Sequence, residues 1–163
     1  MDIRILKTSD AECYRKLRLE ALQNNPESFG SSYEEEKAYS VDMYKNRLDS
    51  NYTFGAFKNK ELIGIVTLFQ EGRHKLKHKA SIFALYVSPE KRGLQIGKHL
   101  MDEAIKKAKG LDGIEQIQLS VVASNAPAKK VYASLGFHTF GREKKALKID
   151  QTYFDEEHMV LFL

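Results

Sequence analysis

The chain has 163 residues, of which 42% are hydrophobic and 29% charged, and its formal net charge is +4. This length and composition fit a single domain, residues 1–163, with a buried core, and they exclude the disordered and fibrous classes. The longest apolar run, residues 82–87, is far shorter than the about 20 residues of a membrane-spanning helix. The N-terminus shows no apolar signal region, so we expect no membrane partner and a cytoplasmic location.

The first third of the chain predicts one strand followed by two helices. Alternating polar and apolar residues indicate the strand at 3–5, and Asn-Asn-Pro at 24–26 ends the first helix. The spacing of Ser32 and Glu35 is typical of a capping box, and the second helix then continues to Leu48. The apolar faces of the two helices consist of Tyr14, Leu17, Ala21, Val41, Tyr44 and Leu48.

Three strands and a basic connector come next. Strands at 52–58 and 61–70 are joined by a turn at 59–60. A connector rich in Lys, Arg and His, residues 72–79, leads into a strand at 81–87. The unbroken apolar character of that strand predicts a central position in the sheet with both faces covered.

The last part of the chain alternates helices and strands. Apolar residues repeat at helical spacing over 96–108, a strand follows at 117–121, and 125–135 reads as a short helix. Strands at 137–149 and 152–163 close the chain. We therefore predict an α/β (α+β) domain, in which a mixed, mostly antiparallel sheet of six to seven strands is flanked by four helices.

The segment 85–98, LYVSPEKRGLQIGK, is the most informative about function, because its pattern is typical of an anion-binding turn. A buried strand leads through a turn into a helix, and the N-terminus of a helix binds anions through free N–H groups and its dipole. Gly93 and Gly97 allow the backbone to approach a phosphate closely, and Arg92 and Lys98 add positive charge. A pyrophosphate is the ligand that this arrangement favours.

Two common phosphate motifs do not fit this segment. The dinucleotide fingerprint G-x-G-x-x-G is absent from the chain. A P-loop needs four residues between its glycines and Ser or Thr after the lysine, whereas three residues separate Gly93 from Gly97, and His99 follows Lys98.

A third motif fits, and a second block supports it. The first block is Val87-x-Pro89-x-x-Arg92-Gly93-x-x-Ile96-Gly97, and it resembles the pyrophosphate turn of the GNAT acetyltransferase superfamily. The second block is Asn125-Ala126-Pro127-Ala128, Val131-Tyr132 and Leu135-Gly136-Phe137, and it resembles the second conserved block of that family. The family usually has Gly where this chain has Gln95. A side chain there is acceptable as long as its φ stays negative.

The resemblance implies an N-acetyltransferase that binds acetyl-CoA and moves the acetyl group to a primary amine by direct attack in a ternary complex. It also implies a central parallel pair of strands that separate near Val87, where pantetheine inserts and the Val87 N–H polarises the thioester carbonyl. The implied cofactor residues are Leu85, Tyr86, Val87, Arg92, Gly93, Leu94, Gln95, Ile96, Gly97, Lys98, Asn125 and Tyr132.

Two residues of the second block have alternative roles. Asn125 binds the pantetheine amide or caps its own helix. Tyr132 lies where many family members place the group that protonates the departing thiolate, so we predict it as the catalytic residue; a buried core tyrosine is the alternative.

The general base and the acceptor amine stay open at this stage. The acidic runs 34–36 and 155–157 could hold a cationic amine, or they could be solvated faces. The connector 73–79 could contact the 3′-phosphate of CoA, an acidic partner or only water. The acceptor could be a polyamine, an amino acid, an antibiotic or a protein amine.

Composition and residue spacing argue against a metal ion and against a nucleic acid partner. His74, His78 and His99 lack metal-ligand spacing, and the single cysteine, Cys13, cannot pair in a zinc site, so no metal is predicted. Lys and Arg are spread along the chain without interleaved aromatic residues, so no nucleic acid partner is expected. A homodimer is compatible with the sequence. The alternative to the enzyme is a catalytically silent GNAT module that holds CoA as a sensor.

Overall fold

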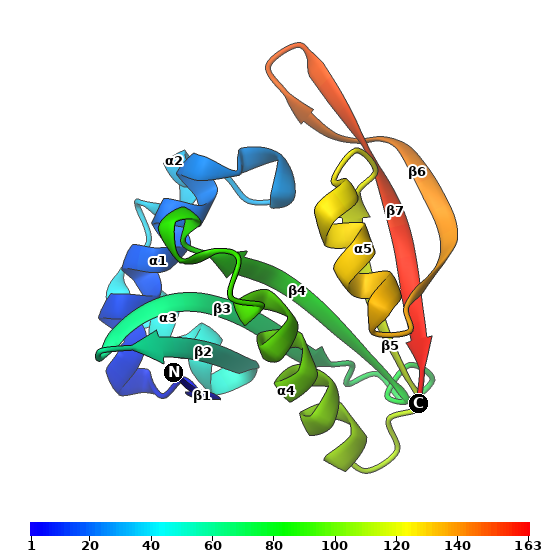
Figure 1. Cartoon of the computed structure of the whole chain (residues 1–163), viewed down its shortest axis with the longest axis horizontal. Coiled ribbons are helices and arrows are strands. Elements are labelled where there is room, and N and C mark those ends of the chain that lie inside the picture. The colour runs from blue at the N-terminus through cyan, green and yellow to red at the C-terminus, as the bar shows by residue number, and fades with distance from the viewer.

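A seven-stranded sheet in the order β1-β2-β3-β4-β5-β7-β6 forms the middle of the computed structural model, which describes residues 1–163 (Figure 1). The strands are β1 (Asp2–Ile5), β2 (Tyr52–Lys58), β3 (Glu61–Gln70), β4 (Lys79–Val87), β5 (Gln116–Val122), β6 (His138–Ile149) and β7 (Thr152–Phe162). Only β4 and β5 pair in parallel, and every other neighbouring pair is antiparallel. The predicted mixed, mostly antiparallel sheet is confirmed.

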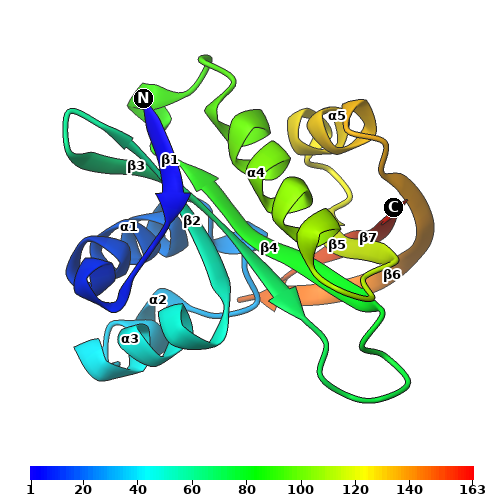
Figure 2. The same ribbon diagram turned by 90° about the horizontal axis from the view of Figure 1, so that it is seen from below.

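Helices cover both faces of this sheet. The helices α1 (Ala11–Asn24), α2 (Tyr33–Glu36) and α3 (Val41–Ser50) lie on one face, and α4 (Ile96–Gly110) and α5 (Ala126–Ser134) lie on the other (Figure 2). Each face has its own apolar core, and alternate residues of β3 contribute to the two cores, as Ile65 and Val66 do. The apolar stripe predicted for α4, Ile96, Leu100, Ala104, Ile105 and Ala108, is buried along its length. None of the helices is long and apolar enough to span a membrane.

The second helix predicted from the sequence is in fact two helices. Ser32 caps α2 by accepting a hydrogen bond from the Glu35 N–H, and the Glu35 carboxylate accepts one from the Ser32 N–H in return. Ser40 then starts α3, because its Oγ accepts a hydrogen bond from the Met43 N–H. The second capping serine therefore interrupts the predicted helix, and the fold has five helices instead of four.

The central strands separate earlier than expected. β4 and β5 pair only from Lys79 with Gln116 to Ser81 with Gln118, so the gap opens after Ser81 instead of near Val87. Within the unpaired part of β4, Ala84 has a φ of 58°, which bends the strand. Phe83 is 48% exposed beside this gap. The prediction that both faces of this strand are covered is therefore wrong in its middle, although its central position is confirmed.

Candidate functional site

A groove of about 580 Å³ runs along the end of β4, the start of α4 and the start of α5. All of the predicted cofactor residues line this cofactor groove except Leu94 and Tyr132. The side chain of Leu94 points away, and the residue is 58% exposed. Asn25, Ser28 and Phe29, from the segment after α1, complete the opposite wall.

The turn before α4 bends through two left-handed residues. Gly93 has a φ of 90° and Gln95 has a φ of 57°, and α4 begins directly afterwards at Ile96. The expectation of a negative φ at Gln95 was therefore wrong, and the positive φ accounts for the glycine that the family usually has there. Left-handed residues next to a residue of ordinary φ, here Leu94, turn neighbouring backbone N–H groups toward one side, which suits an anion next to the N-terminus of α4.

Arg92 and Lys98 differ in the contacts that they make within the protein. The Arg92 Nε donates to the Val87 carbonyl at 3.0 Å, and its Nη2 donates to the Asn25 Oδ1 at 3.2 Å, so Arg92 holds the turn against β4 and the end of α1. Lys98 lines the groove and forms no salt bridge within the protein. Arg92 contacts only neutral oxygens, so both residues can offer positive charge to a ligand, and the Lys98 ammonium is the more mobile of the two groups.

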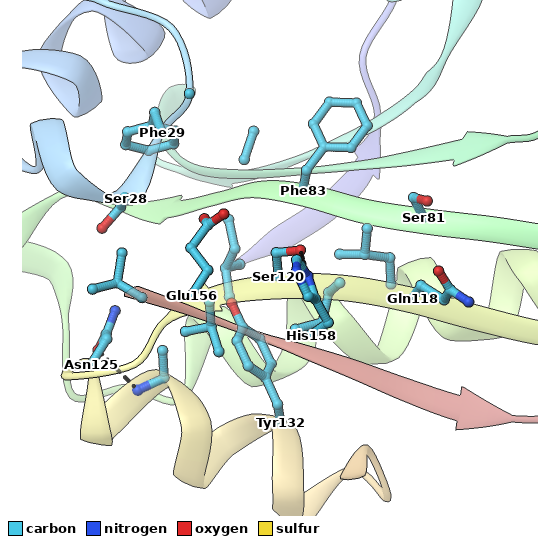
Figure 3. Close-up of a pocket in the computed structure, with 18 of the residues that line it drawn as sticks. Ser28, Phe29, Ser81, Phe83, Gln118, Ser120, Asn125, Tyr132, Glu156 and His158 are labelled. Carbon is cyan, nitrogen blue, oxygen red and sulfur yellow. Dashed lines mark hydrogen bonds between the residues drawn. The ribbon is translucent and has the colours of Figure 1, made fainter. Parts of the chain in front are cut away.

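A second cavity, of about 400 Å³, fills the gap between β4 and β5 (Figure 3). We call it the gap cavity. It shares five residues with the cofactor groove, so the two hollows meet: Ser28, Phe29, Leu85, Asn125 and Ala128. Figure 3 shows that β4, β5, β7 and α5 each direct side chains into it. A ligand that occupies the groove can therefore extend one end into the gap cavity.

Tyr132 lies in the gap cavity, where its ring rises from α5 (Figure 3). The residue is 9% exposed, and its ring packs edge-on against Phe137 with 6.2 Å between the ring centroids. Burial raises the pKa of Tyr132 to about 12. The hydroxyl forms no hydrogen bond within the protein, so it keeps its proton and can donate it to a ligand.

Asn125 can serve in both of its predicted roles at once. Its Oδ1 accepts a hydrogen bond from the Ala128 N–H at 3.2 Å and so caps α5. The side-chain amide group faces both hollows and has no protein acceptor. Capping therefore orients the side chain and leaves its two N–H donors for a ligand.

Glu156 and His158, two residues apart on β7, also point into the gap cavity (Figure 3). His158 Nδ1 lies 2.7 Å from the Ser120 Oγ on β5. Glu156 has no hydrogen-bond partner in the protein. Burial raises the pKa of the Glu156 carboxyl, Glu143 on β6 raises it further, and His158 partly offsets the two. Glu156 is thus a carboxylate with an increased affinity for a proton, in the cavity that Tyr132 also lines.

The other predicted acidic candidates are engaged elsewhere. Glu36 is fully buried and forms salt bridges with Arg18 and Arg47, both at 2.8 Å, so it cannot hold an amine. Asp155 accepts hydrogen bonds from Arg142 and from the Lys145 N–H. The remaining members behave similarly or lie outside the gap cavity: Glu157 pairs with Lys129, and Glu34 and Glu35 line a separate hollow under the β6–β7 hairpin.

The basic connector is far from the groove. It ends at Lys79, the first residue of β4, whereas the groove begins at Leu85, six residues further along that strand. At roughly 3.3 Å per residue, six residues of an extended strand separate the two by about 20 Å. The connector thus lies outside the candidate site, and its exposed residues agree with the solvated-loop alternative.

The comparison with known proteins decides the family. The sequence model of the Acetyltransferase (GNAT) family matches residues 13–137. The chain belongs to this family. This GNAT chain is 24% identical over 137 residues to mycothiol acetyltransferase of Brachybacterium faecium, across 84% of the chain and 40% of that protein. It is 29% identical over 99 residues to the L-amino acid N-acetyltransferase AaaT of Escherichia coli, across 61% of the chain and 60% of that protein.

The GNAT chain therefore spans only about half the length of these curated relatives. Its fold is similar to that of yncA from Salmonella typhimurium, whose structure contains its cofactor acetyl-CoA. The TM-score is 0.87 at 16% identity, and the match covers 100% of this chain and 94% of the other. The predicted GNAT family and fold are both confirmed.

The sequence prediction missed part of the gap cavity. Arg18, Ser120 and His158 line it, and none of them was singled out. The alternation of β7 could have placed His158 on the same face as Glu156, because residues two apart in a strand share a face. Arg18 offered no such signal, since it lies on α1 between apolar positions of the core stripe.

Proposed function

We propose that this GNAT chain transfers an acetyl group from acetyl-CoA to a primary amine by direct attack within a ternary complex. The observation that carries the proposal is that Tyr132 and Glu156 line a cavity that shares five lining residues with the cofactor groove. A groove for pyrophosphate and pantetheine then ends where a proton donor and a proton acceptor lie together. Family membership and the acetyl-CoA of the structurally similar yncA support acetyl-CoA as the donor.

In the proposed complex, the pyrophosphate lies against the N–H groups before and in the first turn of α4, with Lys98 beside it. The pantetheine arm follows β4 past Asn125, and the Val87 N–H polarises the thioester carbonyl. The Glu156 carboxylate takes a proton from the acceptor ammonium, which frees the nitrogen lone pair. The amine nitrogen then bonds to the carbonyl carbon and releases its second proton to solvent, the carbon–sulfur bond breaks, and CoA leaves as a thiolate.

The contribution of Tyr132 follows from the pKa values. The Tyr132 pKa of about 12 lies roughly 3.5 units above the roughly 8.5 of an ordinary thiol, so complete proton transfer to the thiolate is uphill. Tyr132 therefore stabilises the developing charge on sulfur chiefly as a hydrogen-bond donor, and solvent finally supplies the proton. Hydrogen bonds to a charged acceptor are about twice as strong as neutral ones, so the Tyr132 hydroxyl stabilises the departing thiolate more than it stabilises the neutral thioester.

The proposal is tested by following CoA release from acetyl-CoA over a panel of amines, with acetyl-CoA binding measured by calorimetry on the same preparation. We expect binding together with amine-dependent release of CoA. Binding without release for any amine would instead support a CoA-binding module. Absence of binding would contradict the placement of the cofactor.

A further inference from the structure

The gap cavity has charges of opposite sign on its two sides. Arg18 comes from α1, which packs on the half of the sheet formed by β1 to β4, and Glu156 comes from β7 in the other half (Figure 1). Both side chains line the same cavity of about 400 Å³. An amine without an anionic group would use only the Glu156 side of it.

Arg18 keeps one edge of its guanidinium unused. Its Nε and Nη2 donate to the Glu36 carboxylate at 3.1 Å and 2.8 Å, which is a side-on, two-point contact. The third nitrogen, Nη1, donates to no protein atom. Its carbon Cζ lies 4.8 Å from the centre of the Phe29 ring, which lines the same cavity. The guanidinium is therefore held in place by Glu36 and Phe29, with two N–H donors to spare.

Arg18 is not required simply to neutralise the buried charge of Glu36. The same carboxylate also accepts a hydrogen bond from the Arg47 Nη1 at 2.8 Å, and Arg47 does not line the cavity. Two guanidinium groups thus share one carboxylate, and the cluster keeps one positive charge. Arg18 is only 8% exposed, so water screens this charge poorly on the side that faces the cavity.

From this arrangement we infer that the acceptor is a small amino carboxylate, whose anionic group contacts the Arg18 Nη1 while its amino group lies beside Glu156. The inference rests on the proposed acetyl transfer and names its substrate class. A planar guanidinium recognises a carboxylate better than any other side chain does, because its N–H donors match the carboxylate oxygens. A dipolar ligand also fits a cavity with opposite charges on its two sides.

The first experiment compares acceptors in matched pairs. Free α-, β- and γ-amino acids are assayed against their own amides and against the plain amines that lack the carboxyl group. We expect kcat/KM to be about 10- to 100-fold higher for the free amino carboxylate in at least one spacing series. The amides have more free amine at neutral pH, so this bias works against the expected result. Equal or better rates for the amides and plain amines would overturn the inference.

The second experiment uses a matched pair of protein variants. Arg18→Gln and Arg47→Gln each remove one guanidinium from Glu36, but only Arg18 lines the cavity. We expect Arg18→Gln to raise KM for the amino carboxylate at least about tenfold more than it raises KM for the matching amide, with acetyl-CoA affinity unchanged. Arg47→Gln should leave the carboxylate preference intact. An equal loss of preference in both variants would contradict a direct contact.

Two further measurements cover the cases in which Arg18→Gln does not fold or no amine is acetylated. If Arg18→Gln does not fold, Arg18→Lys keeps the charge and removes the second donor nitrogen, and it should reduce the carboxylate preference in part. If no amine is acetylated, calorimetry with CoA present measures amino carboxylate binding directly. Arg18-dependent binding without turnover would then refute the proposed function and retain the inference about the ligand. Turnover of plain amines with no amino carboxylate binding would refute the inference alone.

Discussion

The cofactor groove and the gap cavity are adjacent, but they are built in different ways. The groove takes its shape from backbone: a left-handed turn, the first turn of α4 and the end of β4. The gap cavity takes its chemistry from single side chains that α1, β5, α5 and β7 bring together. A site of the first kind tolerates most side-chain changes, whereas a site of the second kind depends on each of a few groups. This contrast orders the expected effects of substitutions.

The largest effect is expected from Glu156→Gln in the gap cavity. Loss of the proton acceptor should lower kcat/KM by about 100- to 1,000-fold, within the range for general acid–base catalysis. In the parent protein, kcat/KM should fall as pH drops through the pKa of Glu156, which lies above the ordinary value of 4.5 because of burial and Glu143. The variant should lack this acidic limb. A pH profile of kcat/KM for both proteins measures this.

Two controls accompany this prediction. Glu157→Gln removes the neighbouring carboxylate, which pairs with Lys129, and should leave the rate nearly unchanged. Because the folded-state pKa of Glu156 is raised, its ionised form weakens the fold above that pKa, so Glu156→Gln should not lower the Tm at neutral pH. A variant with an unchanged acidic limb would remove Glu156 from the mechanism.

A smaller effect is expected from Tyr132→Phe. Loss of one hydrogen bond to the leaving sulfur should lower kcat by about 10- to 100-fold while acetyl-CoA affinity stays unchanged. Rapid kinetics and calorimetry on one preparation measure both quantities, and a melting curve records stability. A destabilised variant with normal kcat would show that Tyr132 serves only as a core residue, packed on Phe137.

In the groove, a larger side chain should weaken acetyl-CoA binding more than the removal of a side chain does. A Cβ at Gly97 would lie 3.9 Å from Val87 and 4.0 Å from Leu85, which is ordinary contact, so Gly97→Val should fold. The larger side chain would occupy the groove and weaken acetyl-CoA binding about tenfold by calorimetry. Gly110→Val, in open space at the far end of α4, is the matched control. Equal affinity in the two variants would argue against this position for the pyrophosphate.

The smallest effect on affinity is expected from Gln95→Gly. Gln95 is exposed and contributes its backbone, so the change should keep acetyl-CoA affinity within about threefold. The left-handed conformation costs a non-glycine residue roughly 1 kcal/mol, so the Tm should stay the same or rise by a few degrees. Gln95→Ala keeps the strain and serves as the control. A tenfold loss of affinity in Gln95→Gly would mean that the Gln95 side chain itself contacts the cofactor.

The same contrast explains how much the sequence could predict. The groove lies on contiguous segments, so the pattern around Gly93 and Gly97 located it, and the apolar repeat from Ile96 located α4. Backbone conformation within the turn was not predictable, because nothing in the sequence gives the sign of φ at Gln95. The break before α3 depended on which of two serines, Ser32 and Ser40, would start a helix, and both do.

The gap cavity is assembled from residues far apart in the chain, which no local pattern connects. Glu156 was one of six acidic candidates, and only tertiary packing separates it from Glu36, which pairs with two arginines. For Glu36, burial raises the pKa, but the hydrogen bond and charge of Arg18 and the hydrogen bonds of Ser31 and Arg47 outweigh burial and lower the pKa to about 2. Two carboxylates from similar sequence runs thus acquire opposite pKa shifts from their surroundings.

The early separation of β4 and β5 leaves an unpaired strand edge inside the molecule. Such edges normally lie at the rim of a sheet, where another protein chain can add to them and cause aggregation. Here the edge beyond Ser81 is flanked by helices on both faces of the sheet, so a thin, extended molecule can reach it more easily than a second protein chain can (Figure 2). The amide groups of a pantetheine arm can pair with this edge as a peptide would. In the proposed complex, a molecule that is used and replaced at each turnover completes the sheet, so recognition of the cofactor and closure of the fold become the same event.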